Sequence, residues 1–181
     1  MQVEVSHLLA YPRDRVWDVL LDPDVLARVM PGVEKFEEVG PDKYALSMKL
    51  GVPAVRGTYT GKVEIADKDQ PNSYRLRGEG KGAPGWAKGE VLMTLAPEGA
   101  GTRVTANGKA QIGGTIAGVG QRMMEGVAKA MAREFFESID RELQGRREKV
   151  TTFRFSLRLV AGIVASFIRR LFGRRDVQSA G

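Results

Sequence analysis

The chain has 181 residues, 43% hydrophobic and 28% charged, which suits one globular domain with a core and a further segment. It has no cysteine and a single histidine, so disulfides, standard zinc sites and Ser–His or Cys–His catalysis are not expected. The net charge of +6 comes from residues 146–175, which hold nine Lys or Arg and one Glu, whereas residues 1–145 sum to −1; a basic nucleic-acid-binding body is therefore not indicated.

The N-terminal part of the chain predicts a strand followed by two short helices. Residues 2–8 alternate between apolar and polar side chains, as in a strand with one buried face. Apolar residues recur at helical spacing over 16–21, with Pro12 in the first turn, and a second helix is expected over 25–30. The N-terminus has no basic start followed by an apolar run, so a secretory signal is not expected.

Residues 33–112 predict an antiparallel meander of about six strands. Short alternating runs are separated by clusters of Gly, Pro, Asp and Asn. Asn107-Gly108 lies inside one of these runs and predicts a β-bulge. Residues 82–87 predict a separate loop, in which Trp86 either serves as a lid or a membrane-touching wedge or folds back onto the core.

A long amphipathic helix is expected after the strands. Residues 113–115 end the sheet and supply Thr115 as an N-cap, and apolar residues then recur every three or four positions to about Leu143. Three glycines inside this helix cost about 0.5–1 kcal/mol each relative to Ala. They suggest that the helix is thinned where the sheet or a ligand passes close, at Gly118, Gly120 and Gly126.

These elements predict an α+β domain over residues 1–145, in which a long helix covers one face of a curved antiparallel sheet. Sheet and helix are expected to diverge toward one end, which leaves space for an apolar ligand. Methionine side chains suit such a ligand because they adapt their shape. The candidate ligand-binding residues are Trp17, Met30, Met48, Tyr59, Trp86, Met93, Met123, Met124, Val127, Met131 and Phe135.

No catalytic or metal-binding constellation stands out in the sequence. His7 lies on the first predicted strand and is interpreted as structural. Glu134 lies near the apolar face of the long helix, where it either lines a cavity mouth or extends to solvent. The glycine-rich segment 78–82 lacks the spacing of a phosphate loop and is interpreted as bends in the sheet. Three aspartates share a helix face, which is typical of a solvated surface: Asp14, Asp18 and Asp22.

Residues 146–181 predict a second unit, a basic amphipathic segment that associates with a membrane. On a helix over 150–172, one face is apolar and arginines lie opposite. The apolar residues are Phe153, Leu157, Val160, Val164, Phe167, Ile168 and Leu171, and the basic ones are Arg154, Arg158, Arg169 and Arg170. The uncharged run 159–168 is too short to span a bilayer, so an interfacial position is expected. Packing on the domain and docking onto a protein partner are the alternatives.

Several short motifs follow one another in a fixed order along residues 2–145. They are RVWDVLLDP at 15–23, VMPGVE at 29–34, VRGTYTG at 55–61, GEGKG at 78–82, GWAKG at 85–89 and GGT at 113–115. This set resembles the CoxG family, which is named for a subunit of carbon monoxide dehydrogenase, within the START-like and Bet v 1-like helix-grip superfamily (SRPBCC). The resemblance implies a helix-grip fold and a non-catalytic accessory protein. Such a protein recruits molybdenum CO dehydrogenase, or a related molybdenum hydroxylase, to the cytoplasmic side of the cell membrane, where it is peripheral.

The resemblance also implies a bound respiratory quinone, such as menaquinone, that couples CO oxidation to electron transport without a covalent cofactor. Candidate polar contacts to a quinone are Tyr59, Trp86 and Lys88. Two other functions stay open. One is a lipid or hydrophobic-ligand carrier without a redox partner. The other is a polyketide cyclase-like protein, which would need a buried carboxylate or His facing the cavity.

Overall fold

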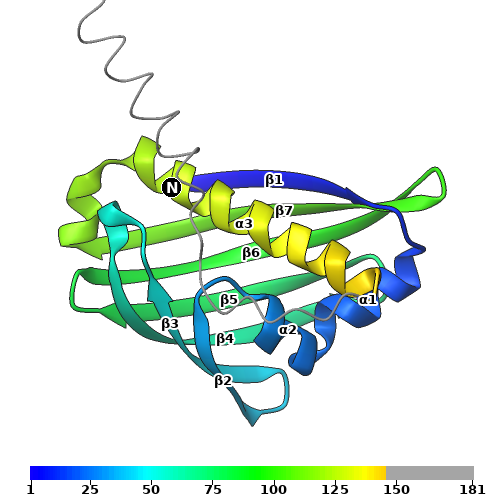
Figure 1. The fold of residues 1–181 in the computed structure, drawn as a ribbon, viewed down its shortest axis with the longest axis horizontal. Helices are drawn as coiled ribbons and strands as arrows, with labels where there is room; N and C mark the ends of the chain where they lie inside the picture. Colours follow the sequence, from blue (N-terminus) through cyan, green and yellow to red (C-terminus); the bar gives the residue numbers. More distant parts are fainter. Residues whose placement is uncertain (146–181) are drawn as a thin grey trace, which may run out of the picture.

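The computed structural model describes residues 1–145, and the predictions for the segment 146–181 lie outside the described residues. Figure 1 shows a long curved sheet with one long helix laid across it. The elements in chain order are β1 (Gln2–Leu9), α1 (Arg13–Leu21), α2 (Pro23–Val29), β2 (Val33–Gly40), β3 (Lys43–Leu50), the 3₁₀ turn η1 (Pro53–Val55), β4 (Gly57–Asp69), β5 (Ser73–Gly82), β6 (Gly85–Glu98), β7 (Gly101–Gly114), the 3₁₀ turn η2 (Thr115–Val119) and α3 (Gln121–Leu143).

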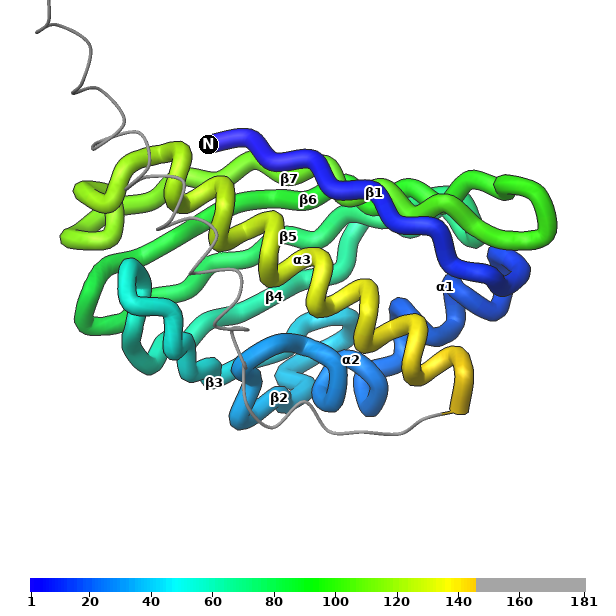
Figure 2. Tube along the Cα trace, turned by 45° about the horizontal axis from the view of Figure 1, so that its top comes forward, coloured from blue at the N-terminus to red at the C-terminus, as the bar shows by residue number. Residues whose placement is uncertain are grey.

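The seven strands form one sheet in the order β1-β7-β6-β5-β4-β3-β2, and every neighbouring pair is antiparallel. The strands β2 to β7 thus form the predicted six-stranded meander, and β1 adds to its β7 edge. The ribbon of Figure 1 and the tube of Figure 2 both show α3 running diagonally over one face of the sheet, close to β1. The predicted α+β helix-grip architecture is confirmed.

Cross-strand pairing sorts the side chains of the sheet into an inner face toward α3 and an outer face. Residues paired on neighbouring strands point to the same side. Tyr74 and Met93 are paired and buried, whereas the next residues along, Arg75 and Leu92, are paired on the outer face. The inner face is therefore apolar, and the outer face carries most of the charged side chains.

The main core lies at the end of the sheet that α1 and α2 close. Trp17 of α1 packs edge-on against Tyr74, with ring centroids 5.6 Å apart. Phe136 of α3 is 1% exposed and stacks on His7 of β1, also at 5.6 Å. The structural interpretation of His7 agrees with this stacking.

A second, smaller cluster closes the opposite end. Val55 of η1 and Ile116 of η2 are buried there with Tyr59 of β4 and Val127 of α3. The two 3₁₀ turns thus fill the end of the sheet that lies farthest from α1 and α2. Between the two clusters, α3 passes over the middle of the sheet.

Glycines allow the sheet to curve around the helix. A Cβ atom at Gly61 would collide with the carbonyl oxygen of Glu79, and one at Gly89 would collide with that of Lys109. Neighbouring strands therefore approach closely at these positions, as expected where a sheet bends strongly.

Two local predictions were wrong. Asn107 and Gly108 pair in continuous register with both β1 and β6, so there is no bulge. Gly108 leaves room on the inner face for Val91, whose side chain lies 3.3 Å from the position that a Cβ atom would take. The long helix does not begin at Thr115, because Gly120 has a φ of +91° and separates η2 from α3. A Cβ atom at Gly118, Gly120 or Gly126 would meet no protein atom within 4 Å, so the sheet does not approach the chain closely at any of the three.

Within residues 1–145, no helix is both long and apolar enough to span a membrane.

Candidate ligand-binding site

Between the two hydrophobic clusters, the inner face of the sheet carries small side chains or none. One cross-strand row on this face reads Tyr44, Val63, Gly78, Gly89 and Ala110, and the next reads Leu46, Gly61, Gly80, Ala87 and Ile112. The centre of both rows consists of glycine and alanine. The sheet therefore presents a shallow trough under α3, flanked by larger apolar side chains.

No atom of α3 fills this trough at its centre. A Cβ at Gly78 would meet only the carbonyl oxygen of Lys62 and a methyl of Val63, both at 3.7 Å. A Cβ at Gly80 would meet only the carbonyl oxygen of Thr60, at 3.6 Å. The helix is thus held above the sheet here, which is the arrangement a ligand between them requires.

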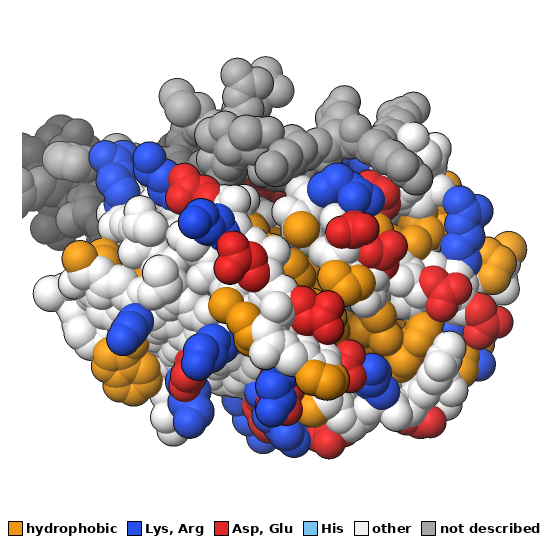
Figure 3. Space-filling view, turned by 90° about the horizontal axis from the view of Figure 1, so that it is seen from below, with side chains coloured by type: hydrophobic (Ala, Val, Ile, Leu, Met, Phe, Trp, Pro, Cys, Tyr) orange, Lys and Arg blue, Asp and Glu red, His pale blue; other side chains and the backbone are white. Residues whose placement is uncertain are grey.

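The walls of the trough are apolar and only partly buried. Val63, Leu76 and Val91 pack against the edge of the main core, and Met124 and Met131 of α3 pack against the second cluster. Ala87 remains exposed although its pairing places it on the inner face. In the view onto the β2 side, apolar side chains are visible at the surface between charged ones (Figure 3).

Polar groups near the trough are few. The Tyr59 hydroxyl donates a hydrogen bond of 2.9 Å to the carbonyl oxygen of Val55, and burial raises its pKa above the ordinary value. Burial, and then the charges of Glu38 and Asp42, raise the pKa of Tyr44. Both phenols therefore stay neutral at physiological pH.

Glu134 is the carboxylate of α3 with the clearest perturbation. It is half-buried, and its pKa is raised by burial first and by the charge of Glu137 second, while Arg141 acts in the opposite direction. Its helical position lies between Met131 and Ser138, whose hydroxyl donates to the Glu134 carbonyl oxygen at 2.8 Å. Glu134 thus belongs to the helix face that turns toward the sheet rather than to the fully solvated one.

The structure distributes the predicted ligand-binding residues over several places. Trp17 and Met93 are buried in the main core, and Phe135 packs against it. Five of the predicted residues belong to or pack on the second cluster: Met48, Tyr59, Met124, Val127 and Met131. Met30 is half-buried at the end of α2, and Met123 is 48% exposed. Met48 and Tyr59 are paired on the inner face one row beyond the trough, and Met124, Val127 and Met131 of α3 belong to or pack on the same cluster.

Trp86 and Lys88 do not face this space. The predicted loop 82–87 is a turn of two residues, because β5 ends at Gly82 and β6 begins at Gly85. Trp86 lies on the outer face, paired with Lys81 and Gly113, and is 46% exposed. The prediction that Trp86 lines the cavity, and that Lys88 contacts a ligand there, is therefore wrong.

The trough itself was not predicted. On sequence alone, Gly78, Gly80 and Gly82 suggest only bends in the sheet. The available signal was their spacing of two, which places all three on one face of a strand. Which face, and which glycines lie beside them, follows only from the register with β4 and β6.

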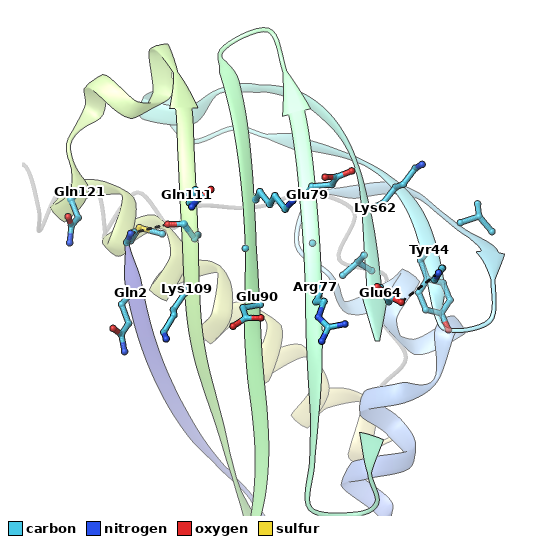
Figure 4. A pocket seen from close by; sticks show the side chains of 18 residues that line it. Gln2, Tyr44, Lys62, Glu64, Arg77, Glu79, Glu90, Lys109, Gln111 and Gln121 are labelled. Atoms are coloured by element: carbon cyan, nitrogen blue, oxygen red, sulfur yellow. Dashed lines mark hydrogen bonds and ion pairs between the residues drawn. The ribbon is translucent and has the colours of Figure 1, made fainter. Parts of the chain in front are cut away.

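Two hollows of about 1160 Å³ and about 680 Å³ lie among the charged side chains of the outer face, directly behind the trough, so that the glycines of the two trough rows also contribute to their lining. The larger one is lined by a row of alternating charges, Lys43, Glu64, Arg77, Glu90 and Lys109. In Figure 4, Arg77, Glu90 and Lys109 of this row lie on the viewer's side of the strands. Such a compensated charged lining does not suit an apolar ligand.

The three aspartates predicted to share a solvated helix face do not all have the same role. Asp14 and Asp18 are exposed, while Asp22 accepts hydrogen bonds from the backbone N–H groups of Asp24 and Val25 and so caps α2. Among residues 1–145, no three His, Cys, Asp or Glu side chains gather in a way that could hold a metal ion.

Comparison with solved structures supports the same architecture. A conserved protein from Geobacillus kaustophilus is 33% identical, with a TM-score of 0.78 over 82% of this chain and 98% of that one. A START superfamily protein from Mycobacterium smegmatis is 10% identical, with a TM-score of 0.64 over 81% of this chain and 99% of that one. TTHA0849 from Thermus thermophilus is 16% identical, with a TM-score of 0.63 over 82% of this chain and 100% of that one.

No curated protein matches the chain. The model of the CoxG family, whose name denotes a carbon monoxide dehydrogenase subunit, matches residues 6–144, which is nearly the whole of the described domain. Together with the START-like fold, this match identifies the chain as a member of the CoxG family.

Proposed function

We propose that this protein is an accessory subunit of molybdenum CO dehydrogenase, or of a related molybdenum hydroxylase, that carries an isoprenoid quinone between α3 and the sheet. Residues 146–181 attach it to the cytoplasmic face of the membrane. In this role it performs no chemistry of its own. It brings the quinone and the electron-donating enzyme together.

The observation that carries the proposal is the glycine-lined trough under α3. Removing apolar surface from water stabilises a bound ligand by about 25 cal/mol per Å². The two apolar rims of the trough supply such surface, and Met124 and Met131 can adapt to an isoprenoid chain. A trough that stayed empty would instead leave apolar side chains in contact with water.

The membrane attachment rests on the sequence of residues 146–181. An apolar face opposite a row of arginines is typical of helices that lie in the interface of a bilayer. A ligand as insoluble as a long-chain quinone is exchanged most readily where it is stored, which is in the membrane.

The test is native mass spectrometry of the full chain purified from its own host without detergent. A co-purifying mass equal to that host's quinone, lost after solvent extraction, is expected. A phospholipid mass in its place would support a lipid carrier instead. No adduct under conditions that retain apolar ligands in a control carrier would refute ligand carriage.

A separate measurement tests the attachment. Sedimentation with vesicles of host lipids should be lost when residues 146–181 are deleted, while the deletion variant keeps the circular dichroism of the domain. Continued sedimentation of a folded deletion variant would contradict the role of this segment.

A further inference from the structure

Trp86 lies flat on the outer face of the sheet. A Cβ atom at Gly113 would collide with the indole ring, including its Nε1 and Cε2 atoms, so the ring occupies the space that any other residue at 113 would take. The indole is nonetheless 46% exposed. A tryptophan held flat in this way presents a ring face for contact rather than a protruding wedge for insertion into lipid.

The row of the sheet that contains Trp86 has no acidic residue. Its members, in order from β2 to β7, are Lys35, Ser47, Thr60, Lys81, Trp86 and Gly113. All of these except Gly113, together with Lys62, Lys88, Glu37 and Glu79 of the next row, line the hollow of about 680 Å³. This hollow, the Trp86 hollow, thus has four lysines and two glutamates.

The second row beyond that of Trp86 on the same face has a different charge pattern. There, Lys43 faces Glu64 at 3.7 Å, and Glu64, Arg77, Glu90 and Lys109 follow with alternating sign. Among residues 1–145, none of the four lysines of the Trp86 hollow has a carboxylate within 4.0 Å. The Lys43 row (the compensated row) alternates in sign, whereas the Trp86 row holds Lys35 and Lys81 without an acidic residue. In the hollow, Glu79 is the cross-strand partner of both Lys62 and Lys88, and four lysines against two glutamates leave an excess of two positive charges.

We propose that the Trp86 hollow is the docking surface for an acidic segment of a partner protein. Tryptophan is enriched among the residues that contribute most to binding at protein interfaces, and an excess of positive charge around it favours a partner segment of opposite charge. The hydroxyls of Ser47 and Thr60 supply further hydrogen-bond donors beside the lysines. This inference depends on the proposed function in one respect, namely that the protein binds another protein.

The hollow and the trough lie on opposite faces of the sheet. A partner bound at the hollow would therefore leave the ligand site under α3 accessible. The concave shape of the hollow favours an extended segment over a flat bilayer surface.

The experiment uses the full chain with Trp17→Phe, so that Trp86 is the only tryptophan. The probe is a twelve-residue peptide of alternating Glu and Leu, with a Gln and Leu peptide as the uncharged control. We expect saturable changes in Trp86 fluorescence with the acidic peptide only, and stronger quenching of Trp86 by iodide than by caesium. Equal quenching by the two ions would overturn the assignment of positive charge to the hollow.

Matched variants locate the binding. Lys62→Glu combined with Lys81→Glu should weaken peptide binding, measured by anisotropy of a labelled peptide, by about tenfold or more. Lys43→Glu combined with Lys109→Glu, which changes the charge equally on the compensated row, should weaken it by less than about threefold. Equal losses in both double variants would show that net charge alone, including that of residues 146–181, governs binding, and would overturn the proposal.

Trp86→Ala should weaken peptide binding by about fivefold to tenfold, whereas Leu92→Ala on the same face should not weaken it.

The last measurement uses vesicles that contain phosphatidylglycerol. If the lysine variants lost vesicle binding and kept peptide binding, the hollow would belong to the lipid surface and the proposal would fail. None of these measurements depends on quinone, so a negative result leaves the ligand proposal standing, and the reverse also holds.

Discussion

Nη2 of Arg28 lies 2.6 Å from Oε1 of Glu142, so one ion pair joins α2 to the last turn of α3. The Glu142 side chain is 9% exposed and that of Arg28 is 30% exposed. Arg15 of α1 donates to the carbonyl oxygen of Leu143 at 2.8 Å and caps the same turn. The two arginines thus fix the C-terminal end of α3 immediately before residue 146.

Replacing Glu142 with Gln should therefore destabilise the domain. The change leaves the Arg28 guanidinium without its charged partner, and a hydrogen bond to a charged group contributes about 1.5–3 kcal/mol. Denaturant unfolding should show a loss in this range. Lys43→Met breaks the exposed pair with Glu64 and should cost less than about 0.5 kcal/mol, so equal losses would contradict the special role of Glu142.

Filling the trough should reduce ligand occupancy without unfolding the protein. Gly78→Val and Gly80→Val place side chains where the nearest atoms lie at 3.6–3.7 Å, which is ordinary contact distance. Valine also suits a strand better than glycine does. The fraction of protein carrying its adduct, read by native mass spectrometry, should fall severalfold. Glu79→Val, between them on the outer face, is the control, and an equal fall in it would count against the trough.

The two helix glycines should respond to alanine in opposite directions. Gly126→Ala should stabilise the domain by about 0.5–1 kcal/mol, because the site is open and alanine is the better helix former. Gly120→Ala should destabilise it by about 1 kcal/mol, because a φ of +91° is unfavourable for any residue with a Cβ atom. Thermal and denaturant unfolding measure both. If Gly120→Ala stabilised the domain instead, η2 and α3 would be able to form one continuous helix.

The raised pKa of Glu134 makes the stability of the domain depend on pH. In the unfolded chain this carboxyl ionises near 4.5, and in the folded protein it ionises at a higher pH because burial disfavours the charge. The cost of ionisation therefore appears as the pH rises through 4.5 and is complete above the folded pKa. Glu134→Gln should be more stable than the parent at pH 7 and no different below pH 4.5, and the gap between the unfolding curves at several pH values measures this.

Most of the fold could be predicted because its strands alternate and are separated by turn residues. The predicted meander over 33–112 corresponds to the strands β2 to β7, because most side chains of an alternating run have a definite face. The start of α3 was misplaced by several residues. Apolar spacing continues unbroken from Ile116 to Ile139, and only the backbone at Gly120 shows the break.

The candidate site was less predictable than the fold. Methionine content indicated an apolar site, yet Met93 of β6 is buried in the main core while Met131 of α3 packs on the second cluster. Which cluster each methionine joins depends on how α3 lies across the sheet, and the sequence does not give that. Trp86 was predicted in a loop over 82–87, whereas it lies on β6 with its side chain on the outer face. The glycines and proline around it did not show where β5 ends and β6 begins, and strand position decides which face a residue takes.

The pairing of β1 with β7 has a consequence for synthesis of the protein. Residues 2–9 leave the ribosome before the rest of the domain, yet within the part of the chain that the structure describes their one neighbour in the sheet is formed by residues 102–109. During most of translation this apolar strand has no partner for its backbone hydrogen bonds. The growing chain can assemble β2 to β6 by local hairpins, but His7 and Leu9 find their places only after about two thirds of the domain has emerged, so nascent chains shorter than this expose an edge that favours aggregation.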